Sequence, residues 1–135
     1  SQILSSRRSK VRLLLDSHVL LWWLEDPKLL DQKLQTILHN PQNEAFFSPA
    51  SIWELGLKIA KGNLKFPSNF TDALLADGFD ELAVTSAHAM RTLTLPRIHL
   101  DPFDRMLISQ TLCEGLVLAT RDATISRYDV PTIQA

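Results

Sequence analysis

Four acidic residues occupy positions in the sequence that are unusual for ordinary solvent-exposed surface acids. Asp16 follows the apolar run 11–15 and precedes a second apolar run, and Asp122 also follows an apolar run closely. Glu54 lies between a tryptophan and a leucine. Asp104 is the first residue of a predicted helix face that continues with mainly apolar residues. A carboxylate between buried segments is costly to desolvate. These four acids are therefore candidates for chemistry that uses their charge.

The chemistry that suits several clustered carboxylates is binding of a hard divalent cation. Carboxylates that share one cleft repel each other and raise each other's proton affinity, and a bound cation removes that repulsion. Oxygen ligands without paired Cys or His favour Mg²⁺ or Mn²⁺ over zinc. The usual task of such a site is to activate water and to stabilise charge on a phosphodiester.

Each acid also has a purely structural explanation. Asp16 and Asp122 could cap the segments that follow them, and Glu54 could form an exposed i,i+4 pair with Lys58. Asp104 would be the third residue of a helix capped by Asp101, where a carboxylate suits the helix dipole. The site prediction therefore depends on all four acids meeting in one place.

Strands and helices are predicted to alternate along the chain, which indicates an α/β domain with a mostly parallel central sheet flanked by helices. Ligands of such sheets bind beyond the carboxyl ends of the strands, where Asp16 and Asp122 are expected. The predicted strands are 11–15, 44–48, 81–84, 116–119 and one near Ile133. The predicted helices are 17–25, 28–39, 50–61, 68–76, 86–92 and 102–114.

Length and composition indicate one domain. The chain has 135 residues, a single cysteine and a formal charge of −1, which argues against a general polyanion binder. Residues 1–10 are expected to be a flexible arm or a remnant of cloning, and 11–135 a single domain. The longest apolar run, 19–24, is far shorter than the ~20 residues of a membrane span. A lone cysteine without an export signal predicts a cytoplasmic protein.

Four segments together resemble the PIN-domain nucleases of the VapC toxin type. Their order and spacing carry the resemblance, which covers nearly the whole chain from about residue 11 to 133. The segments are Leu13-Leu-Leu-Asp16-Ser-His18, Ser48-Pro-Ala-Ser51-Ile-Trp53-Glu54, Asp101-Pro-Phe-Asp104 and Thr120-Arg-Asp122. The resemblance implies a PIN-like three-layer fold and a Mg²⁺- or Mn²⁺-dependent endoribonuclease, the toxin of a toxin–antitoxin pair.

The same resemblance assigns roles to individual residues. It implies that Asp16, Glu54, Asp104 and Asp122 are the catalytic, metal-binding acids. Three further residues would support them: Ser17, Asp101 and Thr120. The implied partners are an RNA substrate, an antitoxin protein and a second copy of the chain.

Two cations adjoin predicted site acids, and we expect Lys58 and Arg121 to contact RNA. Trp22, Trp23 and Trp53 are expected mostly in the core, and the apolar excess in 19–38 favours a homodimer. Two other functions remain open. One is a non-catalytic interaction module whose acids only cap helices. The other is a Mg²⁺-dependent phosphatase, although that class usually has an acid two residues after its nucleophilic aspartate, where this chain has His18.

Overall fold

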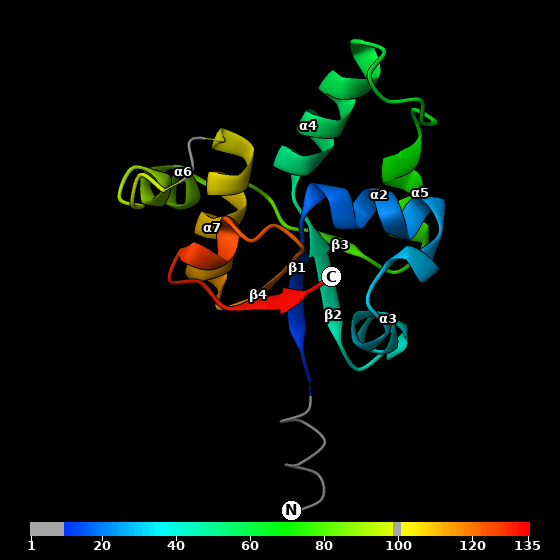
Figure 1. Cartoon of the computed structure of the whole chain (residues 1–135), viewed down its shortest axis with the longest axis horizontal. Helices are drawn as coiled ribbons and strands as arrows, with labels where there is room; N and C mark the ends of the chain where they lie inside the picture. Colours follow the sequence, from blue (N-terminus) through cyan, green and yellow to red (C-terminus); the bar gives the residue numbers. More distant parts are fainter. Residues whose placement is uncertain (1–9, 99–100) are drawn as a thin grey trace, which may run out of the picture.

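A five-stranded parallel sheet forms the centre of the protein (Figure 1). The computed structural model describes residues 10–98 and 101–135. The strand order is β3-β2-β1-β4-β5, so β1 and β4 are neighbours although most of the chain separates them. The strands are β1 (Arg12–Leu15), β2 (Glu44–Phe47), β3 (Asp80–Glu81), β4 (Val117–Thr120) and β5 (Thr132–Gln134). The predicted α/β class is confirmed.

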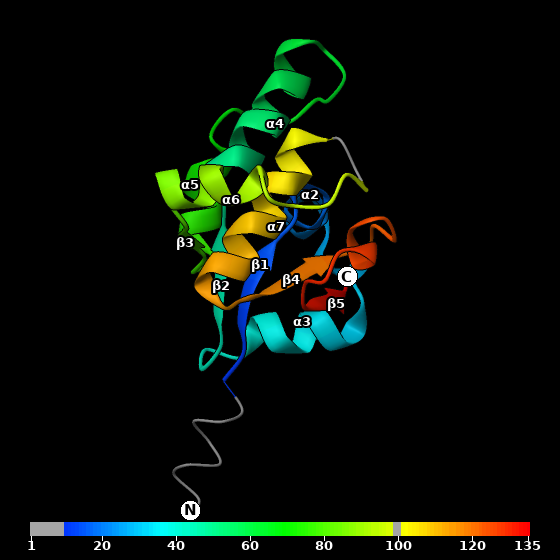
Figure 2. The same cartoon turned by 90° about the vertical axis from the view of Figure 1, so that its left-hand side faces the viewer.

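Helices cover both faces of the sheet and make three layers (Figure 2). Alternate residues of β1 serve the two faces: Leu13 and Leu15 belong to one apolar cluster, and Leu14 belongs to the other. The first cluster takes side chains from α2 (Ser17–Glu25), α3 (Gln32–His39), α4 (Pro49–Ala60) and α5 (Phe70–Ala76). The second takes side chains from α7 (Pro102–Glu114), against which α6 (Ser86–Thr92) packs.

Local capping signals set the helix bounds that the sequence predicts well. The Asp16 side chain accepts from two amides at the start of α2, and Asp101 does the same for α7, whose first residue is a proline. Thr85 and His88 form a reciprocal capping box at the start of α6. Gly115 ends α7 with a φ of +65°, which a residue with a Cβ rarely adopts.

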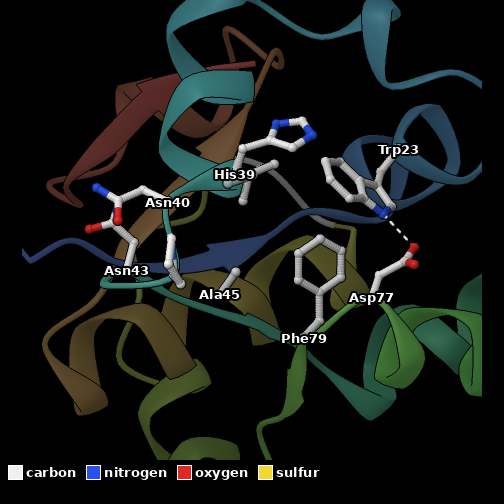
Figure 3. A pocket seen from close by; sticks show the side chains of 10 residues that line it. Trp23, His39, Asn40, Asn43, Ala45, Asp77 and Phe79 are labelled. Carbon is white, nitrogen blue, oxygen red and sulfur yellow. Dashed lines mark hydrogen bonds between the residues drawn. The ribbon is translucent and has the colours of Figure 1, made fainter.

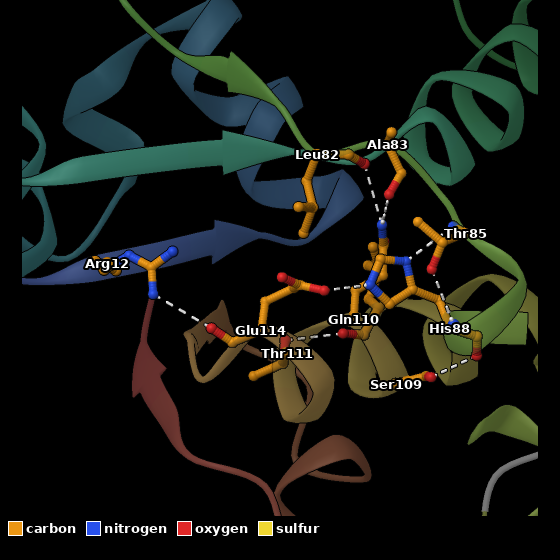
Figure 4. A network of polar contacts seen from close by, with 10 residues as sticks. Arg12, Leu82, Ala83, Thr85, His88, Ser109, Gln110, Thr111 and Glu114 are labelled. Atoms are coloured by element: carbon orange, nitrogen blue, oxygen red, sulfur yellow. Dashed lines mark hydrogen bonds and ion pairs between the residues drawn. The ribbon is translucent and has the colours of Figure 1, made fainter.

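A polar network holds α6 against α7 (Figure 4). The ring of His88 is buried, and its Nε2 lies 2.7 Å from an oxygen of Glu114 near the end of α7. The Ser109 hydroxyl donates to the carbonyl of His88, and Gln110 Nε2 donates to the carbonyl of Leu82, just beyond β3. These bonds fix the position of α7, the helix that Asp101 caps.

Several sequence predictions are wrong in detail. The helix predicted over 28–39 is a 3-10 turn, η1 (Pro27–Leu29), followed by α3, because Asp31 caps a new helix. The strand predicted over 81–84 is only Asp80–Glu81, since its pairing with β2 stops at Glu81. Trp53 is 65% exposed and does not belong to the core. The arm predicted for 1–10 falls on residues outside the described ranges, apart from Lys10.

The described helices are all too short or too polar to cross a lipid bilayer.

Candidate active site

Asp16 is a buried carboxylate at the carboxyl end of β1. It is 5% exposed, and its Oδ1 accepts from the amides of His18 (2.8 Å) and Val19 (3.4 Å). Burial raises the pKa of this carboxyl, although these hydrogen bonds and one from Thr120 favour its charged form. Capping is therefore confirmed for Asp16, but it leaves a buried negative charge whose hydrogen-bond donors in the described chain are all neutral.

Thr120 joins the ends of the two central strands. Its hydroxyl donates to Oδ2 of Asp16 at 2.6 Å and accepts from the amide of Asp122 at 3.0 Å. The side chain of Asp122 accepts from the amide of Thr124 at 2.8 Å, so it also shapes its own turn. All strands are parallel, but the chain proceeds outward from β1 to β2 and β3 on one side and from β4 to β5 on the other. Sheets of this kind bind ligands at the point between β1 and β4 where the strand order reverses.

Glu54 reaches the same region from α4. The hydroxyl of Ser17, the residue after Asp16, donates to its Oε1 at 2.6 Å. Its Oε2 lies 3.5 Å from Nζ of Lys58, one turn further along the helix. The side chain of Glu54 is only 12% exposed, so the carboxylate of the Glu54–Lys58 pair is largely shielded from solvent. The predicted supporting role of Ser17 thus has a geometric counterpart in its bond to Glu54.

Asp104 lies in the first turn of α7. Asp101 caps this turn and accepts from the amides of Phe103 (2.8 Å) and Asp104 (3.3 Å). The ring of Phe103 meets the ring of Trp53 edge to face, with centroids 5.2 Å apart. Asp104 and Glu54 are thus each adjacent in sequence to one member of this contact, which joins α7 to α4.

A hollow of about 350 Å³ opens beside these acids, and we call it the acid hollow. Its lining comprises Asp16, His18, Trp22, Arg121 and Asp122. Neither Glu54 nor Asp104 lines it, and across residues 10–98 and 101–135 no three His, Cys, Asp or Glu side chains are grouped closely enough to hold a metal ion. The structure therefore joins Asp16 to Asp122 and Ser17 to Glu54, while a site shared by all four acids stays a prediction.

The donor chemistry nevertheless fits a hard divalent cation. Asp16 is buried without a cationic hydrogen-bond donor among the described residues, and a carboxylate in that state gains from a positive ligand. The side-chain atoms nearby that could bind a metal are carboxylate and hydroxyl oxygens, which Mg²⁺ and Mn²⁺ prefer as ligands.

Arg121 has a position that its sequence neighbours do not reveal. Its guanidinium carbon lies 4.1 Å from the centroid of the Trp22 ring, and its Nη2 donates to the carbonyls of Leu29 and Ala135, both at 2.8 Å. An edge of the cation is therefore occupied by the protein itself. The predicted RNA contacts of Lys58 and Arg121 stay predictions.

Trp22 is partly buried against the first apolar cluster, as predicted, and it also lines the acid hollow together with His18. The signal was present in the sequence, because residues four apart on a helix share a face and His18 follows closely after Asp16.

The fold is that of a known class of protein. The family model of the PIN domain matches residues 13–131, and the chain therefore belongs to the PIN domain family. PIN domains are generally nucleases. No curated protein sequence matches the chain significantly.

Solved structures with the same fold come from several bacteria. A chain of VapBC2 from Rickettsia felis, bound to a promoter DNA fragment, has a TM-score of 0.72 and 14% identity; the match covers 93% of this chain and 99% of that one. A chain of DNA-bound VapBC from Salmonella typhimurium has a TM-score of 0.65 and 15% identity, with 92% and 98% covered. A chain of a toxin–antitoxin complex from Klebsiella pneumoniae has a TM-score of 0.56 and 18% identity; the match covers 82% of this chain and 86% of that one. At these identities the likeness establishes the fold.

Proposed function

We propose that the protein is a Mg²⁺- or Mn²⁺-dependent endoribonuclease that acts as the toxin of a toxin–antitoxin pair. The observation that carries the proposal is the buried carboxylate of Asp16 at the junction of β1 and β4, bonded through Thr120 to the turn that holds Asp122. Family membership and the fold shared with chains of VapBC complexes support the same activity.

The proposed roles follow from the contacts. Asp16, Glu54, Asp104 and Asp122 would hold the ion, which when bound supplies an acidified water and stabilises charge on the phosphate. Thr120 holds Oδ2 of Asp16 in place, and Ser17 holds Oε1 of Glu54. Asp101 orients the first turn of α7. Side chains fixed in this way need no reorganisation when charge develops on the substrate.

A protein partner is part of the proposal. An apolar hollow of about 510 Å³ lies between α4 and α7, with Trp53, Phe103 and Met106 in its lining. Trp53 in this lining is 65% exposed, and aromatic side chains are enriched at protein interfaces. We propose that an antitoxin binds the protein and that the protein forms a homodimer in the cytoplasm. Light scattering at micromolar concentration tests the dimer, and a monomeric mass would contradict it.

The test of the activity is cleavage of single-stranded RNA by the purified protein with Mg²⁺, with Mn²⁺ or with EDTA. We expect cleavage that needs the metal and that Asp16→Asn abolishes, since Asn keeps the cap but removes the charge. Sequencing the 5′ ends of cellular RNA after expression identifies the cleaved sites. Cleavage that persists in EDTA, or in the Asp16→Asn variant, would contradict the proposal.

The second candidate, a module whose acids only cap, has specific support, because Asp16, Asp101 and Asp122 all accept from backbone amides. It predicts no site-specific effect of Mn²⁺. A Mn²⁺ titration followed by thermal melting, with Asp16→Asn as the control, separates the two candidates.

A further inference from the structure

We propose that His18, Trp22 and Arg121 form a subsite that binds one nucleobase of single-stranded RNA beside the acids. The inference rests on the proposed ribonuclease activity and extends it to the recognition of substrate. All three residues line the acid hollow together with Asp16 and Asp122. The lining therefore combines two carboxylates with three planar groups, the side chains of His18, Trp22 and Arg121, which we call the aromatic wall.

The aromatic wall is a continuous set of planar groups. The ring of His18 lies 5.9 Å from that of Trp22, with a 34° angle between the planes, and the guanidinium of Arg121 lies 4.1 Å over Trp22. Bases of single-stranded RNA stack on aromatic rings and on guanidinium planes of this kind. A nucleobase is the part of the substrate that offers a matching planar face.

Arg121 is held as a platform and not as a mobile phosphate clamp. Its Nη2 donates to two carbonyls, from the segment after α2 and from the residue after β5, and its guanidinium carbon lies over the Trp22 ring. A guanidinium held by its edge keeps a fixed orientation, which reduces the entropy lost when a ligand stacks on it.

The free polar atoms of this wall also suit a ligand. The ring of His18 is exposed, and neither it nor the indole N–H of Trp22 has a hydrogen-bond partner within the described residues. The backbone amide of His18 donates to Asp16, which fixes the backbone of His18 beside the buried acid. A base stacked here would place its own phosphodiester beside the carboxylates.

A second tryptophan–histidine pair supplies a matched control. The rings of Trp23 and His39 lie 5.5 Å apart, but the Trp23 indole donates to Asp77 and Nδ1 of His39 bonds the carbonyl of Gln35. This pair lies outside the acid hollow. His39→Ala therefore removes an exposed ring of the same kind without touching the proposed subsite.

The experiment measures RNA binding by fluorescence anisotropy with Mg²⁺ present, in the full chain carrying Asp16→Asn to prevent cleavage. The ligands are a fluorescein-labelled single-stranded RNA and versions with one abasic position each. We expect one abasic position to weaken binding about fivefold or more. His18→Ala and Arg121→Lys should weaken binding of the intact RNA and abolish the penalty at that position, while His39→Ala changes neither.

Loss of the position-specific penalty is a readout that a merely structural role would not alter. Thermal melting of each variant shows whether it is folded, and His18→Ala is the decisive one because its ring is exposed. If the Asp16→Asn protein binds RNA but His18→Ala leaves both affinity and penalty unchanged, the subsite is overturned and the proposed function survives. If the Asp16→Asn protein binds no RNA, both are overturned.

Discussion

Two neighbouring tryptophans on α2 face two hollows of similar composition and different character. Trp22 lines the acid hollow. Trp23 lines a second hollow of about 420 Å³ that also contains a histidine, His39, and an aspartate, Asp77 (Figure 3). We call the second one the amino-end hollow, because its other lining residues include those just before β2 and β3.

Polar side chains of the amino-end hollow have hydrogen-bond partners within the protein. Trp23 donates to Asp77 at 2.8 Å, and Asn43 bonds both the amide of Val11 and the carbonyl of Ile37. In the acid hollow, Asp16 is buried and its carboxylate receives neutral donors only. Residue types alone therefore do not mark a site. Position at the carboxyl ends of the strands, and a buried carboxylate whose hydrogen-bond donors in the described ranges are all neutral, distinguish the acid hollow.

The largest expected difference between the hollows comes from neutralising one aspartate in each. Asp122→Asn and Asp77→Asn both keep an oxygen that can accept the existing hydrogen bond. We expect Asp122→Asn to reduce RNA cleavage about 100-fold or more, because a charge that holds a catalytic metal is worth several kcal/mol. Asp77→Asn should cleave like the unmodified protein. Equal activity of the two variants would contradict the conclusion that the acid hollow and not the amino-end hollow belongs to the active site.

Asp104→Asn tests whether the acidic site extends to α7. We expect cleavage to fall at least about tenfold while the fold survives, since only the charge is removed. In metal-free protein the change should also relieve repulsion between carboxylates. If Asp104 only complements the helix dipole, denaturant melts will show a loss of ~0.3–1 kcal/mol and cleavage will persist.

Thr120→Val tests the link between the two central strands. Valine leaves Oδ2 of Asp16 without its hydrogen-bond donor and the amide of Asp122 without its acceptor. Thr120 is only 5% exposed, so water does not readily replace these bonds. We expect a loss of ~1–3 kcal/mol in unfolding free energy and weaker cleavage. Thr120→Ser keeps the hydroxyl and should retain both properties. A fully stable and active valine variant would show that the link is dispensable.

The smallest expected effect concerns pH. Burial raises the pKa of Asp16, so the folded protein holds this proton to a higher pH than the unfolded chain. Stability of metal-free protein should therefore fall as pH rises from the unfolded value of ~3.9 through the raised folded pKa. At pH values below the pKa of the unfolded chain, Asp16 is protonated in both states, and the cost of ionising the buried carboxyl is absent. Denaturant melts across this range should show the fall in the Asp77→Asn protein and not in Asp16→Asn.

The sequence predicted best what depends on local signals. The bounds of α2, α6 and α7 follow from caps that are contiguous with each helix, and the acids were found at the ends of apolar runs. What the sequence could not predict depends on distant partners. Nothing near Arg121 indicates that it bonds Leu29 and Ala135, and the apolar pattern of α4 does not reveal that Trp53 lies on its exposed side.

The short strand β3 illustrates the same limit. The apolar residues 82–84 favour a strand over 81–84, but how far this segment pairs depends on the neighbouring strand, which ends at Phe47. Similarly, the site prediction identified four acids, whereas their mutual distances depend on the packing of α4 and α7 against the sheet.

The bond from Thr120 to Asp16 joins residues that are 104 positions apart in the chain. β1 leaves the ribosome early, yet its buried acid acquires its hydroxyl partner only after β4 has been synthesised and inserted beside it. Contacts of such long sequence separation form late, because loop closure is costly. A chain that ends before β4 thus lacks Thr120, Arg121 and Asp122. A ribonuclease built in this way would stay inert during its own translation and become active only when its last strands have folded.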